Sequence, residues 1–170
     1  MKFKTGDVVN FNWEGGLFSK LIRYYNIFNY GESTATHSGI ISKVTGSSVW
    51  IHEAIDGRKK EFGPYEYSIE WMMKSKEQGI ITIRRPTVSV KKINEICMSY
   101  EDFQYDWISI LLMPFTFFKA TPNSVFCSEA VARILYDVSD KKLNIAEELE
   151  KDYEKISPMD LQITSQLKTI

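Results

Sequence analysis

Two apolar runs joined by a polar turn constrain the fold of this chain more than any other feature. Ser38–Val44 and Val49–Ile55 are rich in residues that favour strands, and residues 45–48 between them (Thr-Gly-Ser-Ser) are typical of a hairpin turn. Shorter runs at residues 8–11 and 80–84 have the same strand character. Strands joined by so short a turn run antiparallel, so we expect a small, mostly antiparallel sheet.

Apolar residues at helical spacing predict several helices around that sheet. The predicted helices lie at Leu17–Tyr25, Pro64–Met73 and Val90–Tyr100, after Phe126, and after Ser157, which is expected to cap a short helix with Pro158 in its first turn. Residues 26–36 are polar and are predicted to form a loop. The chain has 170 residues, 44% of them hydrophobic, and no linker-like segment divides it. We therefore expect one α+β domain spanning residues 1–170.

Charge and hydropathy exclude some classes of protein. The formal net charge is −1, and basic residues form no stripe, so neither nucleic acid nor an anionic membrane is an expected partner of the chain as a whole. The longest apolar stretch, Ile108–Phe118, is broken by Pro114 and is too short to span a membrane. With no signal-peptide pattern at the N-terminus, we expect a cytoplasmic protein without an integral membrane segment. Ile108–Phe118 has two interpretations, a buried core segment or the wall of a groove for acyl chains.

The two cysteines have different surroundings. Cys97 lies on the apolar stripe of a predicted helix and is interpreted as a small buried hydrophobe. Cys127 follows Asn123 and Ser124, which are predicted to cap a helix that starts near the cysteine. Free N–H groups in a first helical turn stabilise a thiolate and an oxyanion, so Cys127 is either a nucleophile or a second core cysteine.

A nucleophilic cysteine needs a base, and the chain has only two histidines. His37 lies where a polar loop meets a strand, whereas His52 lies inside the next strand, beside Glu53. Glu53 falls in an otherwise apolar row and is the best candidate to orient the histidine, because a carboxylate there needs a partner. Since strand side chains alternate, the hairpin register decides whether His37 shares a face with Glu53 or with His52, and the sequence leaves this open. Two histidines and two cysteines without zinc-ligand spacing predict no metal, and no cofactor is expected.

The order of these short motifs resembles that of a known family. The motifs are Gly6-Asp7-Val8-Val9, Thr36-His37-Ser38-Gly39-Ile40, Val49-Trp50-Ile51-His52-Glu53-Ala54, Arg84-Arg85-Pro86, Tyr105-Asp106, Phe126-Cys127-Ser128-Glu129-Ala130 and Ile156-Ser157-Pro158-Met159-Asp160-Leu161. In this order they are similar to the circularly permuted papain-like hydrolases of the NlpC/P60 superfamily, in particular the YiiX/YaeF-like amidase group. Each motif is short, but together they cover nearly the whole chain.

The resemblance implies a permuted papain-like fold in which the histidine strand precedes the cysteine helix. It also implies Cys127 as nucleophile, His37 as general base and then acid, and Glu53 as the residue that orients His37. Tyr105 resembles a tyrosine near the oxyanion site of such enzymes, although a packed aromatic residue is an equal alternative. Asp7 and Trp13 are expected near the groove.

The implied reaction is hydrolysis of an amide bond through an acyl-enzyme, in cell-wall-type peptides or in small aminoacyl or γ-glutamyl amides. Two alternatives remain: a lipid acyl hydrolase or acyltransferase of the LRAT-like type, and a non-catalytic binding module that retains the fold.

Overall fold

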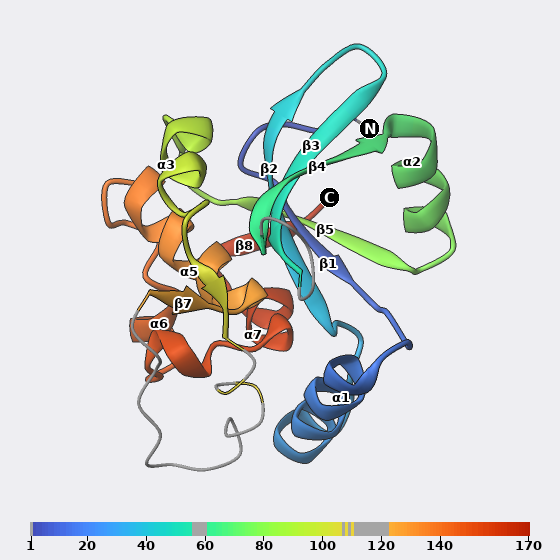
Figure 1. Ribbon diagram of the computed structural model, residues 1–170, viewed down its shortest axis with the longest axis vertical. Helices are drawn as coiled ribbons and strands as arrows, with labels where there is room; N and C mark the ends of the chain where they lie inside the picture. Colours follow the sequence, from blue (N-terminus) through green and yellow to red (C-terminus); the bar gives the residue numbers. More distant parts are fainter. Residues whose placement is uncertain (1, 56–60, 107, 109, 111–122) are drawn as a thin grey trace.

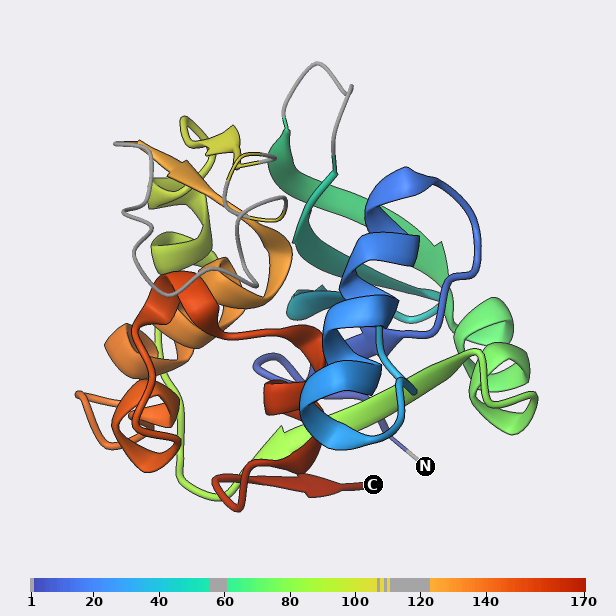
Figure 2. The same ribbon diagram turned by 90° about the horizontal axis from the view of Figure 1, so that it is seen from below.

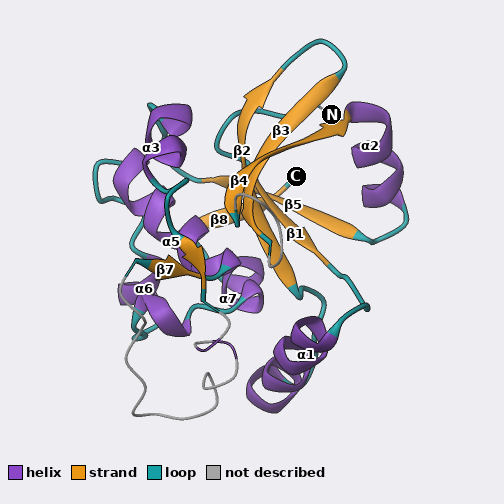
Figure 3. Ribbon diagram, in the orientation of Figure 1, coloured by secondary structure: helices purple, strands orange, loops and turns teal. Residues whose placement is uncertain are grey.

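Six antiparallel strands form the central sheet of the computed structural model, which describes residues 2–55, 61–106, 108, 110 and 123–170 (Figures 1 and 3). In spatial order the strands are β4 (Phe62–Ser68), β3 (Ser48–Ala54), β2 (His37–Val44), β1 (Val8–Phe11), β5 (Ile81–Pro86) and β8 (Leu167–Thr169). Each neighbouring pair is antiparallel. The expected hairpin is the β2–β3 pair, and the α+β class is confirmed.

Helices cover both faces of this sheet. Helices α3 (Ile93–Ser99) and α5 (Cys127–Val138) lie against one face, and α2 (Ile69–Glu77) lies beside the other (Figure 1). The strand residues alternate accordingly. Val8 and Ile40 belong to the core under α5, whereas Val9 and Ile41 belong to the core on the α2 side. This alternation, which follows from the two-residue period of strands, places each candidate histidine on a defined face.

The remaining elements lie around the sheet. Helix α1 (Leu17–Tyr30) connects β1 to β2 and projects from the body of the molecule (Figures 1 and 2). The C-terminal part contains α6 (Ile145–Glu148), a 3-10 helix (Tyr153–Lys155) and α7 (Pro158–Ile163). Strands β6 (Gln104–Tyr105) and β7 (Ser124–Val125) form a separate parallel pair directly before α5. Strand β7 of this pair is therefore separated from Cys127 by Phe126 alone.

The helix starts test two of the expected caps. Ser157 caps α7 in a reciprocal capping box with Asp160, and Pro158 is in the first turn, as predicted. The expected cap of α5 by Asn123 or Ser124 is wrong, because Phe126 is the N-cap residue and makes no side-chain cap bond. Asn123 takes a left-handed conformation with φ 59°, and Ser124 pairs with Gln104 in the β6–β7 pair. Strand pairing thus uses the residues that the local pattern assigned to capping.

The prediction of a helix over Pro64–Met73 is also wrong in its first half. Residues 62–68 form β4, and the helix begins only at Ile69, capped by the Ser68 side chain. Strand β4 is at the edge of the sheet, where a proline is tolerated because its missing N–H need not meet a neighbour. Helix α1, in contrast, extends past the predicted Tyr25 to Tyr30 before Gly31 ends it at φ 78°.

Within residues 2–55, 61–106, 108, 110 and 123–170, no helix is long and apolar enough to cross a bilayer. Most of the Ile108–Phe118 stretch lies outside the described residues.

Candidate active site

The first residue of β2, His37, is a buried imidazole with a defined orientation. It pairs in register with Phe11 of β1 and is 6% exposed. The Trp13 ring stacks on it, with 4.7 Å between ring centroids and 9° between the planes. Phe11 packs beside the same imidazole at 5.4 Å. Trp13, expected near the groove, therefore packs directly against the candidate base and limits its rotation.

Glu53 is the direct partner of His37, with 2.7 Å between Nε2 of the imidazole and Oε2 of the carboxylate. The hairpin register places Glu53 opposite Gly39 and His52 opposite Ile40, which answers the question that the sequence left open. Glu53 and His37 share one face, and His52 points to the other. A side chain at Gly39 could not be accommodated, since its Cβ would lie 2.5 Å from Ile51 and 3.1 Å from the Cβ of Glu53. Glycine at position 39 therefore allows the carboxylate to approach the imidazole.

A second hydrogen-bond donor binds the other carboxylate oxygen of Glu53. The Tyr67 hydroxyl of β4 donates to Oε1 at 2.6 Å, so both carboxylate oxygens accept a hydrogen bond although Glu53 has no exposed surface. A buried carboxylate held in this way costs much less than an unpaired one. Tyr67 was not predicted as a site residue, because the helix predicted at this position concealed the alternation of Gly63, Tyr65 and Tyr67 along β4. That alternation was the available signal.

Cys127 is the first residue of α5, directly after Phe126. Its sulfur lies close enough to His37 to raise the pKa of the imidazole. Because Nε2 of the imidazole is bound to Glu53, Nδ1 is the ring nitrogen left for the sulfur. The first N–H groups of a helix have no partner within it, and Phe126 supplies no side-chain acceptor. The residues that the sequence analysis singled out, Cys127, His37 and Glu53, thus come together from α5, β2 and β3.

The electrostatics of the site favour a charged imidazole. Burial acts against the imidazolium, but the Cys127 sulfur and the Glu53 carboxylate outweigh it and raise the pKa of His37 to about 10, from an ordinary 6.5. An imidazolium beside the sulfur stabilises a thiolate. Cys127 is fully buried in this conformation, so a substrate reaches the sulfur only when neighbouring groups move.

Cys97 lies in α3 and is fully buried, as expected. Burial, together with the nearby Glu101 carboxylate, raises the pKa of its thiol to about 12. The thiol of Cys97 is therefore neutral at physiological pH and unreactive, since the thiolate is the nucleophile.

Tyr105 and Asp7 both make contacts that connect elements of the fold. Tyr105 lies in β6 opposite Val125, two residues before Cys127, and its ring packs against Phe18 with 6.2 Å between centroids. The structure brings Tyr105 beside the strand that leads to the cysteine, and its role at the oxyanion site stays a prediction. Asp7 is bound by the Arg85 guanidinium through two bonds of 2.7 Å, an arrangement that joins the start of β1 to β5.

Glu129, two residues after the cysteine, is a buried acid for which the sequence predicted no role of its own. Arg133 holds it through a 2.9 Å bond and also binds Glu154, which ties α5 to the 3-10 helix. Burial raises the pKa of Glu129 to about 7 despite the opposing effect of Arg133. This acid helps to fix the helix that carries Cys127.

Among the described residues, no cluster of three histidine, cysteine, aspartate or glutamate side chains is arranged to hold a metal ion. Comparisons with protein-family models, with curated proteins and with solved structures found no match.

Proposed function

We propose that this chain is a cysteine hydrolase of the circularly permuted papain-like class, with Cys127 as nucleophile, His37 as base and acid, and Glu53 as the residue that orients His37. The observation that carries the proposal is that one imidazole, His37, is bound by Glu53 at 2.7 Å and lies beside the Cys127 sulfur, which raises its pKa. A nucleophile, a base and an orienting acid within hydrogen-bond reach are the general signature of covalent catalysis. The order of these residues along the chain supports the permuted arrangement.

The reaction follows from these positions. The Cys127 sulfur attacks a carbonyl carbon, an S–C bond forms, and the carbonyl π electrons move to oxygen. N–H groups in the first turn of α5 stabilise that oxyanion. The proton on Nδ1 of His37 passes to the leaving amine nitrogen as the C–N bond breaks, which leaves an acyl thioester. His37 then removes a proton from water, the hydroxide attacks the thioester, and the S–C bond breaks to release the thiolate and a carboxylic acid, which loses its proton to the solvent.

The proposed substrate is an amide, in a cell-wall-type peptide or in a small aminoacyl or γ-glutamyl amide. This choice is supported by the resemblance of the ordered motifs to the amidase group. A screen by mass spectrometry of muropeptides and phospholipids, with Cys127→Ser as control, tests it. Peptide cleavage that requires Cys127 is expected, and release of fatty acid without peptide cleavage would contradict the amide assignment.

Alkylation with iodoacetamide tests the reactive pair without knowledge of the substrate. The matched variants are Cys97→Ala, which leaves Cys127 as the only thiol, and Cys127→Ala, which leaves Cys97. At about pH 6 we expect Cys127 to be labelled stoichiometrically, about tenfold or more faster than a simple thiol, because little of a simple thiol is ionised there. Cys97 should stay unlabelled until the protein is unfolded. Labelling of Cys127 at the rate of a simple thiol, unchanged in His37→Ala, would refute the enzyme proposal.

A further inference from the structure

Helix α1 presents an apolar stripe to solvent. The stripe consists of residues at helical spacing, three or four apart: Leu17, Lys20, Tyr24, Ile27 and Phe28. Phe28 is 89% exposed, Tyr24 73%, Leu17 66% and Ile27 47%. A single exposed apolar residue needs no explanation, but a continuous helical row of them marks an interaction surface.

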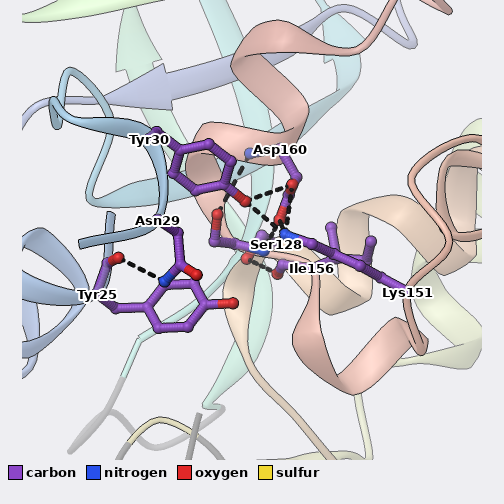
Figure 4. A network of polar contacts seen from close by, with 8 residues as sticks. Tyr25, Asn29, Tyr30, Ser128, Lys151, Ile156 and Asp160 are labelled. Carbon is purple, nitrogen blue, oxygen red and sulfur yellow. Dashed lines mark hydrogen bonds and ion pairs between the residues drawn. The ribbon is translucent and has the colours of Figure 1, made fainter. Parts of the chain in front are cut away.

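The opposite side of α1 carries polar residues that bind the body of the protein. Asn26 is fully buried and donates to the Ala35 carbonyl at 2.8 Å, and Arg23 donates to Asn12 at 3.0 Å. At the C-terminal end of the helix, the Tyr30 hydroxyl donates to Asp160 of α7 at 2.6 Å, and Lys151 binds the same carboxylate (Figure 4). These bonds prevent α1 from turning about its axis, so its apolar stripe is held outward.

The size and chemistry of the stripe indicate what kind of partner binds it. A helix of 14 residues is about 21 Å long, and one of its faces covers roughly 200 Å², well below the roughly 800 Å² per partner of a stable dimer. Lys20 is the only charged residue of the stripe, and two of its members are aromatic. Leucine and aromatic side chains with a cationic residue are the composition of helices that lie in the plane of a lipid interface.

We infer that α1 docks this protein on the surface of a lipid bilayer through the stripe formed by Leu17, Lys20, Tyr24, Ile27 and Phe28. The net charge of the chain is −1, so the attraction to lipid is local to this helix and mainly apolar.

The docked helix brings the candidate active site to the membrane. Trp13, which stacks on His37, lies four residues before α1, and His37 itself lies seven residues after it. Phe18 in the first turn of α1 packs against Tyr105. The Cys127 site would then meet carbonyl compounds held at the bilayer surface, a consequence that rests on the proposed function, whereas the docking itself does not.

Sedimentation with lipid vesicles tests the inference on the full chain. The vesicles are phosphatidylcholine alone and phosphatidylcholine mixed with phosphatidylglycerol in equal parts. The double variant Leu17→Ser/Phe28→Ser removes two exposed members of the stripe, and Lys20→Glu reverses its charge. Met98→Ser and Ile163→Ser are matched controls, since these side chains are 56% and 50% exposed on other helices.

We expect the native chain to sediment with both vesicles, and more strongly with the anionic ones. The double variant should bind about tenfold or more weakly, and Lys20→Glu about fivefold more weakly on anionic vesicles only, whereas both controls bind like the native chain. No sedimentation of the native chain, or equal loss in the controls, would overturn the inference. A change of the double variant from dimer to monomer in analytical ultracentrifugation, with vesicle binding unchanged, would also overturn it and assign the stripe to a second copy. Alkylation of Cys127 is measured in the same samples, so loss of docking with normal labelling separates this inference from the proposed function.

Discussion

Two sets of cysteine, histidine and glutamate residues lie around the same hairpin, with the two histidines on its opposite faces, and only one set has the geometry of a reactive site. In one set Glu53 holds His37 at 2.7 Å, and the Cys127 sulfur raises the pKa of that imidazole. On the other face His52 lies 3.4 Å from Glu101, close to the helix that carries Cys97. The residue types are the same, so the difference must come from their positions.

The helix positions of the two cysteines differ most. Cys127 is the first residue of α5, where free N–H groups and the helix dipole favour a negative sulfur. Cys97 is near the C-terminal end of α3, where the dipole disfavours a negative charge. Glu101 adds a second negative charge beside Cys97, whereas Cys127 has the His37 imidazolium. A cysteine near a histidine and an acid is thus reactive only when the acid acts on the histidine and not on the thiol.

Replacement of each cysteine by serine gives the largest expected difference between the two sets. Cys127→Ser should lower hydrolysis of any substrate found in the screen by about 10⁴-fold or more, because serine beside this imidazole is a much poorer nucleophile than a thiolate. Cys97→Ser should leave the rate close to native. The measurement is the initial rate on purified variants whose circular dichroism spectra match. Equal losses in both variants would remove the distinction between the two faces.

The two acids give the next largest difference. Glu53→Gln keeps the size of the side chain but removes the charge that holds the imidazolium, so we expect a loss of about 10²-fold or more in the labelling rate of Cys127 or in hydrolysis. Glu101→Gln on the other face is the matched control and should change neither quantity appreciably. A normal rate in Glu53→Gln would show that His37 is oriented by the Trp13 stack alone.

The pH dependence of stability tests the charge assigned to His37. Its folded pKa of about 10 exceeds the ordinary 6.5, so the stability gained from its proton is complete below pH 6.5 and is lost as the pH rises through 10. The free energy of unfolding of the native chain, relative to His37→Gln, should fall by a few kcal/mol, on the order of the linkage value for such a shift, across that range. Urea denaturation at several pH values measures it. Cys127→Ser should flatten the decline, because the sulfur is a main cause of the raised pKa, and parallel curves for all three proteins would refute the ion pair.

Local sequence patterns identified the members of the site but could not determine how they meet. Cys127, His37 and Glu53 are visible because each interrupts a regular pattern, at a helix start, a strand start and an apolar row. Their contact depends on the β2–β3 register and on the absence of a side chain at Gly39, which are properties of two paired strands. Sequence alone could not choose between Glu53 and His52 as the residue that shares the face of His37.

The wrong predictions have a common physical cause, since tertiary pairing outweighed local preference. Pro64 suits a first helical turn, but at a sheet edge it is tolerated in β4, opposite His52. Ser124 suits a cap, but its backbone pairs with Gln104. Tyr67 was missed for the first of these reasons. The four inner strands of the sheet and most helices were predictable from periodicity, whereas the edge strands β4 and β8 and the short parallel pair were not.

The smallest expected effect concerns the hydrogen bond from Tyr67 to Glu53. Tyr67→Phe removes the hydroxyl that donates to Oε1 at 2.6 Å and leaves the bond to His37 in place. One hydrogen bond to a charged group is worth about 1.5–3 kcal/mol, but water and the remaining bond to His37 compensate in part, so we expect a loss of only about 3–10-fold in the Cys127 labelling rate. Tyr65→Phe, on the same face of the same strand, is the matched control and should label like the native chain. If Tyr67→Phe instead caused a loss as large as Glu53→Gln, the hydroxyl would be essential to hold the carboxylate against the imidazole. The reactive face would then differ from the His52–Glu101 face by a buried charge with two donors as well as by the position of its cysteine.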